Sequence, residues 1–310
     1  MTTILHGADI LRTDTLKDEE LELILSTAAR FERELEAGNR LTNMAGQVMA
    51  ALFFEPSTRT RLSFEAAMHR LGGAVITVAD PETSSAAKGE TLADAVTVVE
   101  GYADVIAMRH PRKGSAAEAA EAVSVPVING GDGAGQHPTQ ALLDTYTIQK
   151  EKGTLEGLTV AVAGDLKNGR TVHSLVYLLG RYGMRLIFVS PAQLRMPGEI
   201  TEDLVSQGVD VSETEDLAGA MRESDVVYMT RIQKERFEDP AEYQRLKGSY
   251  VMDRAMVEQA QEGITIMHPL PRVNEIEEEV DEYPGAAYFR QAHNGVPVRM
   301  ALLALVTGRE

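Results

Sequence analysis

Short apolar runs alternate with segments of helical periodicity along this chain, and this alternation is the feature that most restricts its fold. Each run has a length suited to a buried strand, and the runs cover residues 48–54, 74–79, 104–109, 126–130, 158–164, 185–190, 225–230 and 264–268. Helices are expected at 16–37, 59–71, 90–101, 114–123, 169–182, 199–207, 214–222, 241–247, 253–261 and 298–306. Repetition of strand, helix and strand predicts parallel sheets covered by helices on both faces.

A polar, glycine-containing stretch at residues 149–157 interrupts the alternation and is the expected junction between two lobes. The length of 310 residues fits two domains of about 150 residues each. The expected fold class is therefore α/β, with two doubly wound lobes, each a parallel sheet flanked by helices. The final apolar helix has no strand after it, and its periodicity leaves open which lobe it packs against.

The composition excludes several functional classes. With a formal net charge of −17, the chain is unsuited to nucleic acid or an anionic membrane as its main partner, because phosphate groups select lysine and arginine surfaces. The absence of cysteine rules out a disulfide, a thiolate zinc site, an iron–sulfur cluster and a cysteine nucleophile. No apolar run approaches the ~20 residues that cross a bilayer, and the N-terminus lacks the pattern of a secretion signal. We expect a cytoplasmic protein.

The turn after the first expected strand, "EPSTRTR", concentrates hydroxyl and guanidinium groups where a helix begins. Ligands of open parallel sheets bind beyond the carboxyl ends of the strands. Since the first N–H groups of a helix attract anions, Ser57, Thr58, Arg59 and Thr60 predict a phosphate site. The glycine-rich sequence of a P-loop is absent. Taken alone, the turn fits an ordinary helix cap with solvent-facing arginines at least as well.

Cations and amides also follow other expected strands. In the first half these residues are Arg109, His137 and Gln140, and in the second half they are Lys167, Arg170, Arg231, Gln233 and Arg272. Each has a structural alternative, which is a surface ion pair for an arginine and a core position for the histidine. Their concentration at strand ends of an acidic chain favours binding sites for anions in both lobes. The spacing at 164–169 does not match a dinucleotide-binding loop.

The strand-end sequences together resemble the motif set of aspartate transcarbamoylase catalytic chains. The matching stretches are "FFEPSTRTRLSFE", "SSAAKGETLAD", "MRHP", "QHPTQALLD", "GDLKNGRTVHSL", "TRIQKER" and "HPLPR". They occur in order across nearly the whole chain. The resemblance implies a carbamoyl phosphate-binding domain at 1–149, joined by a returning C-terminal helix at 291–310, and an L-aspartate-binding domain at 150–290. It also implies a homotrimer with active sites shared between subunits.

The resemblance carries site roles to the matching positions of this chain. The implied carbamoyl phosphate ligands are Ser57, Thr58, Arg59, Thr60, Arg109, His137, Gln140, Leu270 and Pro271. The implied L-aspartate ligands are Lys88, Arg170, Arg231 and Gln233, and the implied contributions of the neighbouring subunit are Ser84 and Lys88. Arg59, Thr60, Arg109 and His137 are the implied catalytic residues. No metal and no organic cofactor is implied.

Two positions depart from the family pattern. Asn168 stands where many relatives have tyrosine, and Ala87 stands where some have a second lysine. The first departure touches the contacts that set the open and closed states.

The implied reaction is direct attack of the aspartate amine on carbamoyl phosphate, which needs fixed cations because both substrates are anions. Ornithine transcarbamoylase is the nearest alternative, but that family typically has cysteine in its "HCLP" turn, where this chain has "HPLP". A non-catalytic scaffold of the same family is a second alternative, although every matched ligand position is filled. The sequence leaves open whether regulatory chains join the trimer.

Overall fold

The computed structural model describes residues 3–79, 89–232, 240–246 and 248–310. The chain forms two compact units. Unit 1 consists of Met1–Leu143 and His293–Glu310, and unit 2 consists of Asp144–Ala292. Each unit is built on a parallel sheet flanked by helices, as the alternation predicts. The expected α/β fold class is confirmed.

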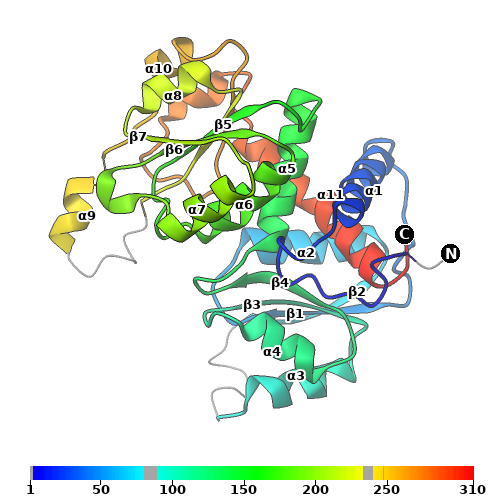
Figure 1. Cartoon of the computed structure of the whole chain (residues 1–310). Helices are drawn as coiled ribbons and strands as arrows, with labels where there is room; N and C mark the ends of the chain where they lie inside the picture. The colour runs from blue at the N-terminus through cyan, green and yellow to red at the C-terminus, as the bar shows by residue number, and fades with distance from the viewer. Residues whose placement is uncertain (1–2, 80–88, 233–239, 247) are drawn as a thin grey trace. The chain divides into compact units, whose positions relative to one another are not determined.

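The sheet of unit 1 has the strand order β2-β1-β3-β4. Its strands are β1 (Val48–Phe53), β2 (Ala74–Val78), β3 (Val105–His110) and β4 (Val127–Asp132). Its helices are α1 (Asp18–Glu36), α2 (Arg59–Arg70), α3 (Leu92–Glu100) and α4 (Ser115–Ala122). Since strand side chains alternate between the faces, Ala50 and Leu52 of β1 pack with α3 and α4, whereas α2 covers the other face (Figure 1).

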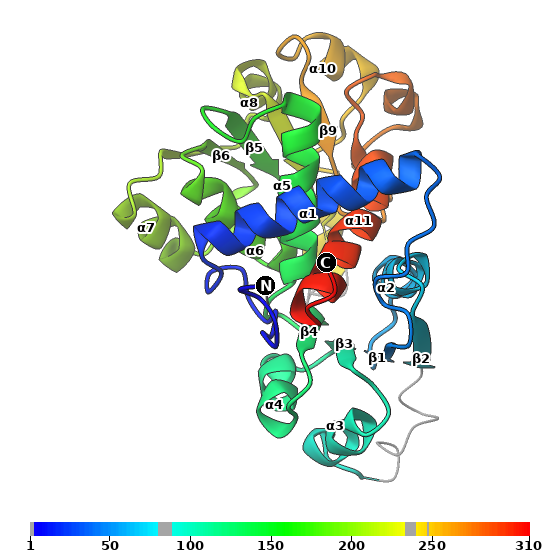
Figure 2. The ribbon, with the colours of Figure 1, turned by 90° about the vertical axis from the view of Figure 1, so that its right-hand side faces the viewer.

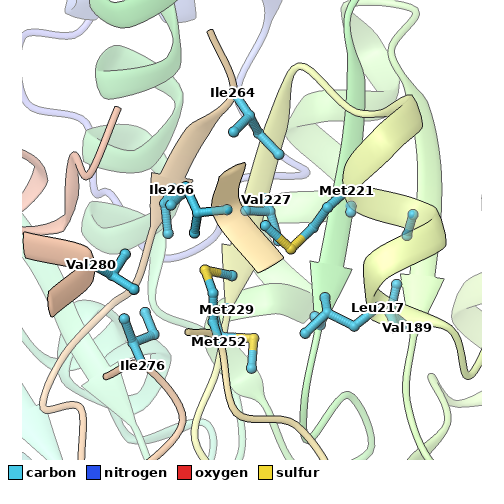
Figure 3. Packing of buried hydrophobic residues seen from close by; sticks show 14 of the residues in the cluster. Val189, Leu217, Met221, Val227, Met229, Met252, Ile264, Ile266, Ile276 and Val280 are labelled. Carbon is cyan, nitrogen blue, oxygen red and sulfur yellow. The ribbon is translucent and has the colours of Figure 1, made fainter. Parts of the chain in front are cut away.

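The sheet of unit 2 has the order β7-β6-β5-β8-β9. Its strands are β5 (Thr159–Ala163), β6 (Arg185–Val189), β7 (Val211–Thr214), β8 (Val226–Met229) and β9 (Thr265–Met267). The α-helices within this unit are α6 (Arg170–Arg181), α7 (Gly198–Ser206), α8 (Leu217–Glu223), α9 (Pro240–Leu246) and α10 (Arg254–Glu258). Figure 3 shows the core between the sheet and α8, where Val227, Met229 and Ile266 of the strands meet Leu217 and Met221 of the helix.

Helices α5 (Pro138–Lys152) and α11 (Tyr288–Val306) both contain a division between the units. The end of α11 belongs to unit 1, as the resemblance implied for the C-terminal helix. Gly7 of the N-terminal segment donates a backbone hydrogen bond to the carbonyl of Val306. Figure 2 shows the two ends of the chain close together there. The binding of carbamoyl phosphate to 1–149 with 291–310, and of L-aspartate to 150–290, stays a prediction.

Three elements differ from the sequence-based expectation. Helix α5, at Pro138–Lys152, was not among the expected helices and extends into the stretch 149–157 that was expected to be the junction. The edge strand β7, at Val211–Thr214, was not expected, because its residues are polar and only half-buried or exposed. Helix α11 begins at Tyr288, ten residues before the expected start at 298, and contains Pro297. Its first half mixes polar side chains with glycine and proline, so the apolar pattern is visible only after residue 298. The helix nevertheless buries Gln291, Asn294 and Arg299.

None of the helices in the described ranges combines the length and the apolar character that a bilayer span requires.

Candidate active site

The β1–α2 turn lies at the carboxyl edge of the unit 1 sheet. Helix α2 begins at Arg59, and Thr58 occupies the N-cap position. The side chain of Thr58 makes no capping hydrogen bond among the described residues, so the cap alternative is not supported for this hydroxyl. Thr58 and Arg59 are exposed, Ser57 is half-buried and Thr60 is buried. The turn therefore directs hydroxyl and guanidinium groups outward at a helix N-terminus, where partial positive charge favours an anion.

Three predicted site residues converge beside this turn. Parallel pairing aligns Phe53 of β1 with Arg109 of β3, which brings the β1–α2 turn next to the end of β3. A Cβ atom on Gly131 would lie 3.2 Å from Arg109 Nη1 and 3.5 Å from His137 Cδ2. A Cβ atom on Gly130 would lie 3.4 Å from Thr60 Cγ2. Thr60, Arg109 and His137 therefore surround the glycine pair, and a side chain at Gly131 would crowd Arg109.

The guanidinium of Arg109 is largely buried and is held by long hydrogen bonds. Nη2 donates to Glu55 Oε1 at 3.3 Å, and Nη1 donates to the carbonyl of Gly130 at 3.4 Å. The Arg109 side chain is only 12% exposed, and its buried Nε has no hydrogen-bond partner in the described part of the chain. A partly desolvated cation with long contacts retains capacity to bind an anion strongly.

Sequence reasoning missed the two carboxylates that shape this region. Glu55 pairs with Arg109, and it immediately follows the apolar run, which is the signal that could have pointed to it. Asp132 is buried and accepts hydrogen bonds from the backbone N–H groups of Gly114, at 2.7 Å, and Gln136, at 2.5 Å. These bonds fix the glycine-rich segment that leads to His137. No sequence pattern distinguishes Asp132 from an ordinary turn aspartate.

His137 and Gln140 lie at the start of α5. His137 is 4% exposed and immediately precedes the helix, and its carbonyl accepts from the N–H of Gln140 at 3.0 Å. Gln140 is half-buried. The predicted spacing of three residues is therefore realised on the first helical turn, next to the glycine pair.

In unit 2, the turns after β5 and β8 each carry a predicted arginine. Arg170 is the first residue of α6, and Arg231 follows β8, which pairs directly with β5. Thr230 Oγ1 joins the two turns, because it donates to the carbonyl of Ala163 and accepts from the N–H of Asp165, both at 3.1 Å. The carboxyl ends of neighbouring strands thus hold two arginines at half-buried positions, as a dicarboxylate would require.

Asn168 replaces the usual tyrosine of the motif and has a clear local role. Its side-chain amide donates to both carboxylate oxygens of Asp165, each at 3.1 Å, and its backbone N–H donates to Oδ1 at 3.0 Å. The carbonyl of Asn168 accepts from the N–H of Arg170. Asn168 therefore fixes the turn that places Arg170.

The turn after β9 contains Leu270 and Pro271, joined by a cis peptide bond, with Leu270 in the left-handed region at φ 56°. Buried His268 and Glu275 pair through Nε2 and Oε1 at 2.7 Å. Burial raises the pKa of Glu275, but the hydrogen bonds that its carboxylate accepts from His268 and from backbone N–H groups outweigh burial, so its pKa lies below the usual value. This pair closes the segment 268–275 around the turn.

Arg272, which follows β9, has partners within unit 2. Its guanidinium forms an ion pair with Asp281 and contacts the Tyr288 hydroxyl. These contacts account for its position without a ligand, and its grouping with the anion-binding cations stays a prediction. Ser84, Lys88 and Gln233 lie outside the described residues, as does Ala87. In the described ranges, no group of three or more histidine, aspartate or glutamate side chains is placed to hold a metal ion.

Comparison with known proteins places these features in a family. A profile described as "Aspartate/ornithine carbamoyltransferase, carbamoyl-P binding domain" matches residues 8–151, and one described as "Aspartate/ornithine carbamoyltransferase, Asp/Orn binding domain" matches residues 156–306. The aspartate carbamoyltransferase catalytic subunit of Methanopyrus kandleri is 54% identical over 301 residues, covering 97% of both chains. The chain belongs to the aspartate carbamoyltransferase catalytic-chain family.

Solved structures of family members agree with this assignment. The catalytic subunit of M. jannaschii aspartate transcarbamoylase matches with a TM-score of 0.90 and 50% identity, covering 96% of both chains. Aspartate transcarbamoylase from Trypanosoma cruzi, in complex with carbamoyl phosphate and aspartate, matches with a TM-score of 0.93 and 43% identity, covering 98% of both chains. As a member of this family, the chain is a carbamoyltransferase.

Proposed function

We propose that this chain transfers the carbamoyl group of carbamoyl phosphate to the amine of L-aspartate, giving N-carbamoyl-L-aspartate and phosphate. The observation that carries the proposal is the convergence of Thr60, Arg109 and His137 around the Gly130–Gly131 pair. Side chains that carry a hydroxyl, a guanidinium and an imidazole, gathered around two adjacent glycines, can hold a carbonyl oxygen on which negative charge develops. The Trypanosoma cruzi relative binds both substrates, which supports the same pair for this chain.

The phosphate of carbamoyl phosphate is assigned to the α2 N-terminus. Ser57, Thr58, Arg59 and Thr60 offer hydroxyl, guanidinium and backbone N–H donors there, and Arg109 and Gln140 complete the set. Thr60, Arg109 and His137 are assigned to the carbonyl oxygen. Each such donor stabilises the transition state by about 2–4 kcal/mol, and the leaving phosphate dianion is stabilised by the helix N-terminus and the arginines.

L-Aspartate is assigned to Arg170 and Arg231, with Gln233 and Lys88 added from the family resemblance. Two arginines suit the two carboxylates of aspartate, because guanidinium and carboxylate form paired hydrogen bonds. Ornithine carries a side-chain ammonium, which these arginines would repel. The pairing of β5 with β8, and the Thr230 bridge between their turns, support a fixed spacing of the two arginines.

The turn at Leu270 and Pro271 is assigned to the amide end of carbamoyl phosphate. Proline has no N–H group, so Pro269 and Pro271 offer only carbonyl oxygens. The N–H of Leu270 is already donated to His268 Nδ1 at 2.8 Å. The backbone of these three residues therefore offers a ligand only acceptors, which suits the two N–H donors of a carbamoyl NH₂ group.

The reaction proceeds by direct attack. The neutral amine of aspartate attacks the carbamoyl carbon, the C–N bond forms, the C–O bond to phosphate breaks, and the amine proton leaves with the product phosphate. No enzyme nucleophile is needed, because the chain supplies binding, orientation and charge stabilisation.

The proposal extends to assembly and setting. We assign a homotrimer in which Ser84 and Lys88 reach the site of the neighbouring subunit, working in the cytoplasm at the committed step of pyrimidine synthesis. The support is the family resemblance of the whole chain. Whether regulatory chains join the trimer is a separate question that a measurement of the solution mass of the native complex answers.

A colorimetric assay for carbamoyl-aspartate on the purified chain tests the proposal. Carbamoyl phosphate with L-aspartate is expected to give product, whereas carbamoyl phosphate with L-ornithine is expected to give none. Product with ornithine alone, or with neither amine, would overturn the proposed function.

A further inference from the structure

A continuous set of buried hydrogen bonds surrounds His268, directly after β9. The His268 N–H donates to Gln291 Oε1 at 2.8 Å, and Gln291 Nε2 donates to Asp144 Oδ1 at 2.7 Å. The other oxygen of Asp144 accepts from the Tyr228 hydroxyl at 2.7 Å. All four side chains are at most 1% exposed. Because buried polar groups are costly to leave unsatisfied, this arrangement fixes the backbone of His268 against α11.

The hydrogen bonds define one tautomer of the His268 ring. A backbone N–H can only donate, so Nδ1, which accepts from the N–H of Leu270 at 2.8 Å, carries no proton. The ring proton is then on Nε2, which donates to Glu275 Oε1 at 2.7 Å. The other oxygen of Glu275 accepts from the N–H groups of Val273 and Asn274, at 3.2 and 3.1 Å. Both ring nitrogens therefore have defined partners, one on each side of the turn.

The bond from Leu270 to His268 has two effects on the turn. Leu270 has φ 56°, and the left-handed region is sterically unfavourable for a non-glycine residue, so this conformation needs support from its surroundings. The bond supplies that support, and it also withdraws the single backbone N–H among Pro269, Leu270 and Pro271. Without Nδ1, Leu270 would relax and the carbonyls on either side of it would change direction.

We propose that His268 is a positioning residue that determines specificity for the amide NH₂ of the carbamoyl donor. It does so by holding the Pro269–Pro271 backbone as a surface made only of hydrogen-bond acceptors. This inference rests on the proposed function, since it assumes that the turn meets carbamoyl phosphate. An acyl phosphate with a methyl group in place of NH₂ has no N–H group to donate to these carbonyl oxygens, and it leaves them without hydrogen bonds.

Acetyl phosphate is the probe, because it differs from carbamoyl phosphate only by that methyl group. The measured quantity is the ratio of the two dissociation constants, obtained by calorimetry on the full chain. Two variants test the contributions of the two ring nitrogens independently. His268→Asn keeps an acceptor near the Nδ1 position, and His268→Gln keeps a donor near the Nε2 position but offers Leu270 nothing.

We expect His268→Gln to reduce the preference for carbamoyl over acetyl phosphate by about tenfold, in line with one or two lost hydrogen bonds. His268→Asn is expected to retain most of the preference. His173→Gln is the matched control, because it removes a different histidine of unit 2, which is half-buried and whose Nε2 contacts the carbonyl of Leu166. It should leave the ratio unchanged.

A ratio that stays at the wild-type value in folded His268→Gln would overturn the inference, as would an equal loss in both His268 variants.

If the variants do not fold, nitrogen NMR of ¹⁵N-histidine-labelled wild-type chain tests the inference through the tautomer of His268. A neutral His268 with its proton on Nε2 supports the inference, and a proton on Nδ1 refutes it. A wild-type chain that binds carbamoyl phosphate no better than acetyl phosphate, and forms no carbamoyl-aspartate, would instead refute the proposed function.

Discussion

At the scale of single residues, the candidate site depends on where side chains are missing as much as on where they are present. Gly131 has φ 121°, and a Cβ atom there would crowd Arg109 Nη1, at 3.2 Å. Both properties restrict this position to glycine. The positioning of a catalytic cation is thus fixed by a residue that has no side chain.

Gly131→Ala is expected to reduce the turnover rate by about 100-fold, comparable to the loss of one oxyanion donor, because the new methyl group would lie 3.2 Å from Arg109 Nη1 and shift this guanidinium. Gly46→Ala is the matched control. Gly46 also has a positive φ, at 82°, but nothing lies within 4 Å of its Cβ position. Both variants should lose roughly 1–2 kcal/mol of stability from backbone strain. Steady-state kinetics and urea unfolding check the prediction, and equal turnover of the two variants would contradict it.

Arg59→Ala is expected to lower turnover by about 100-fold or more while the fold persists, because the α2 N-terminus loses a charged phosphate ligand. Arg70→Ala removes an exposed arginine from the other end of the same helix and should leave turnover near the wild-type value. Activity assays and circular dichroism on both variants provide the comparison. Near-normal turnover of Arg59→Ala would remove Arg59 from the site.

At the scale of elements, parallel pairing brings the site residues of each unit to one edge of a sheet. In unit 2, the spacing of Arg170 and Arg231 depends on the turns after β5 and β8, which Thr230 Oγ1 connects. Gly164, with φ 115°, allows this contact, since a Cβ there would lie 2.5 Å from Thr230 Oγ1. The two turns therefore behave as one support for the arginines.

Thr230→Val replaces the bridging hydroxyl with a methyl group of similar shape and leaves the N–H of buried Asp165 without its acceptor. We expect the KM for aspartate to rise about tenfold, the equivalent of roughly 1.4 kcal/mol, with little change in the KM for carbamoyl phosphate. Thr230→Ser keeps the hydroxyl and should behave like the wild type. A parallel rise in both KM values would point to general destabilisation instead.

The sequence predicts the elements best where their apolar residues are buried on both faces. Strands β1, β3, β5 and β8 follow from their apolar runs, and the motif spacing identified Arg109, His137 and Arg170 because each stands at a strand end or helix start. The same reasoning failed for β7, whose edge position tolerates polar residues.

Other features could not be read from the chain, because they depend on partners that are distant in the sequence. Asp132 accepts a hydrogen bond from the N–H of Gly114, which lies 18 positions away in the sequence. Gln291 donates a hydrogen bond to Asp144, which lies 147 positions away. Arg272 was grouped with the anion-binding cations because local sequence does not reveal its partner Asp281. The tautomer of His268 likewise follows from three-dimensional contacts alone.

At the scale of the whole molecule, the proposed trimer makes a prediction about mixed chains. Lys88→Ala and Arg59→Ala chains are each expected to be nearly inactive, because every site then lacks one essential cation. In the proposed trimer, each site combines Arg59 of one chain with Lys88 of its neighbour. Trimers reassembled from a mixture therefore contain some sites that lack both residues and some sites that have both. Recovery of activity after dissociation and mixing is therefore expected. Failure to recover any, with hybrid trimers verified by charge-shift electrophoresis, would contradict donation of Lys88 by a neighbour.

The return of the chain to unit 1 sets an order on biosynthesis. Val298 and Met300–Val306 are fully buried in α11, and this segment of unit 1 follows unit 2 in the sequence. Unit 2 is continuous in sequence, from Asp144 to Ala292, so all its residues have been synthesised before unit 1 can complete its core. The usual order, in which the N-terminal domain folds first, therefore does not apply in full here: the core of unit 1 can close only after unit 2 has been synthesised, and removal of the second half of α11 would leave it incomplete.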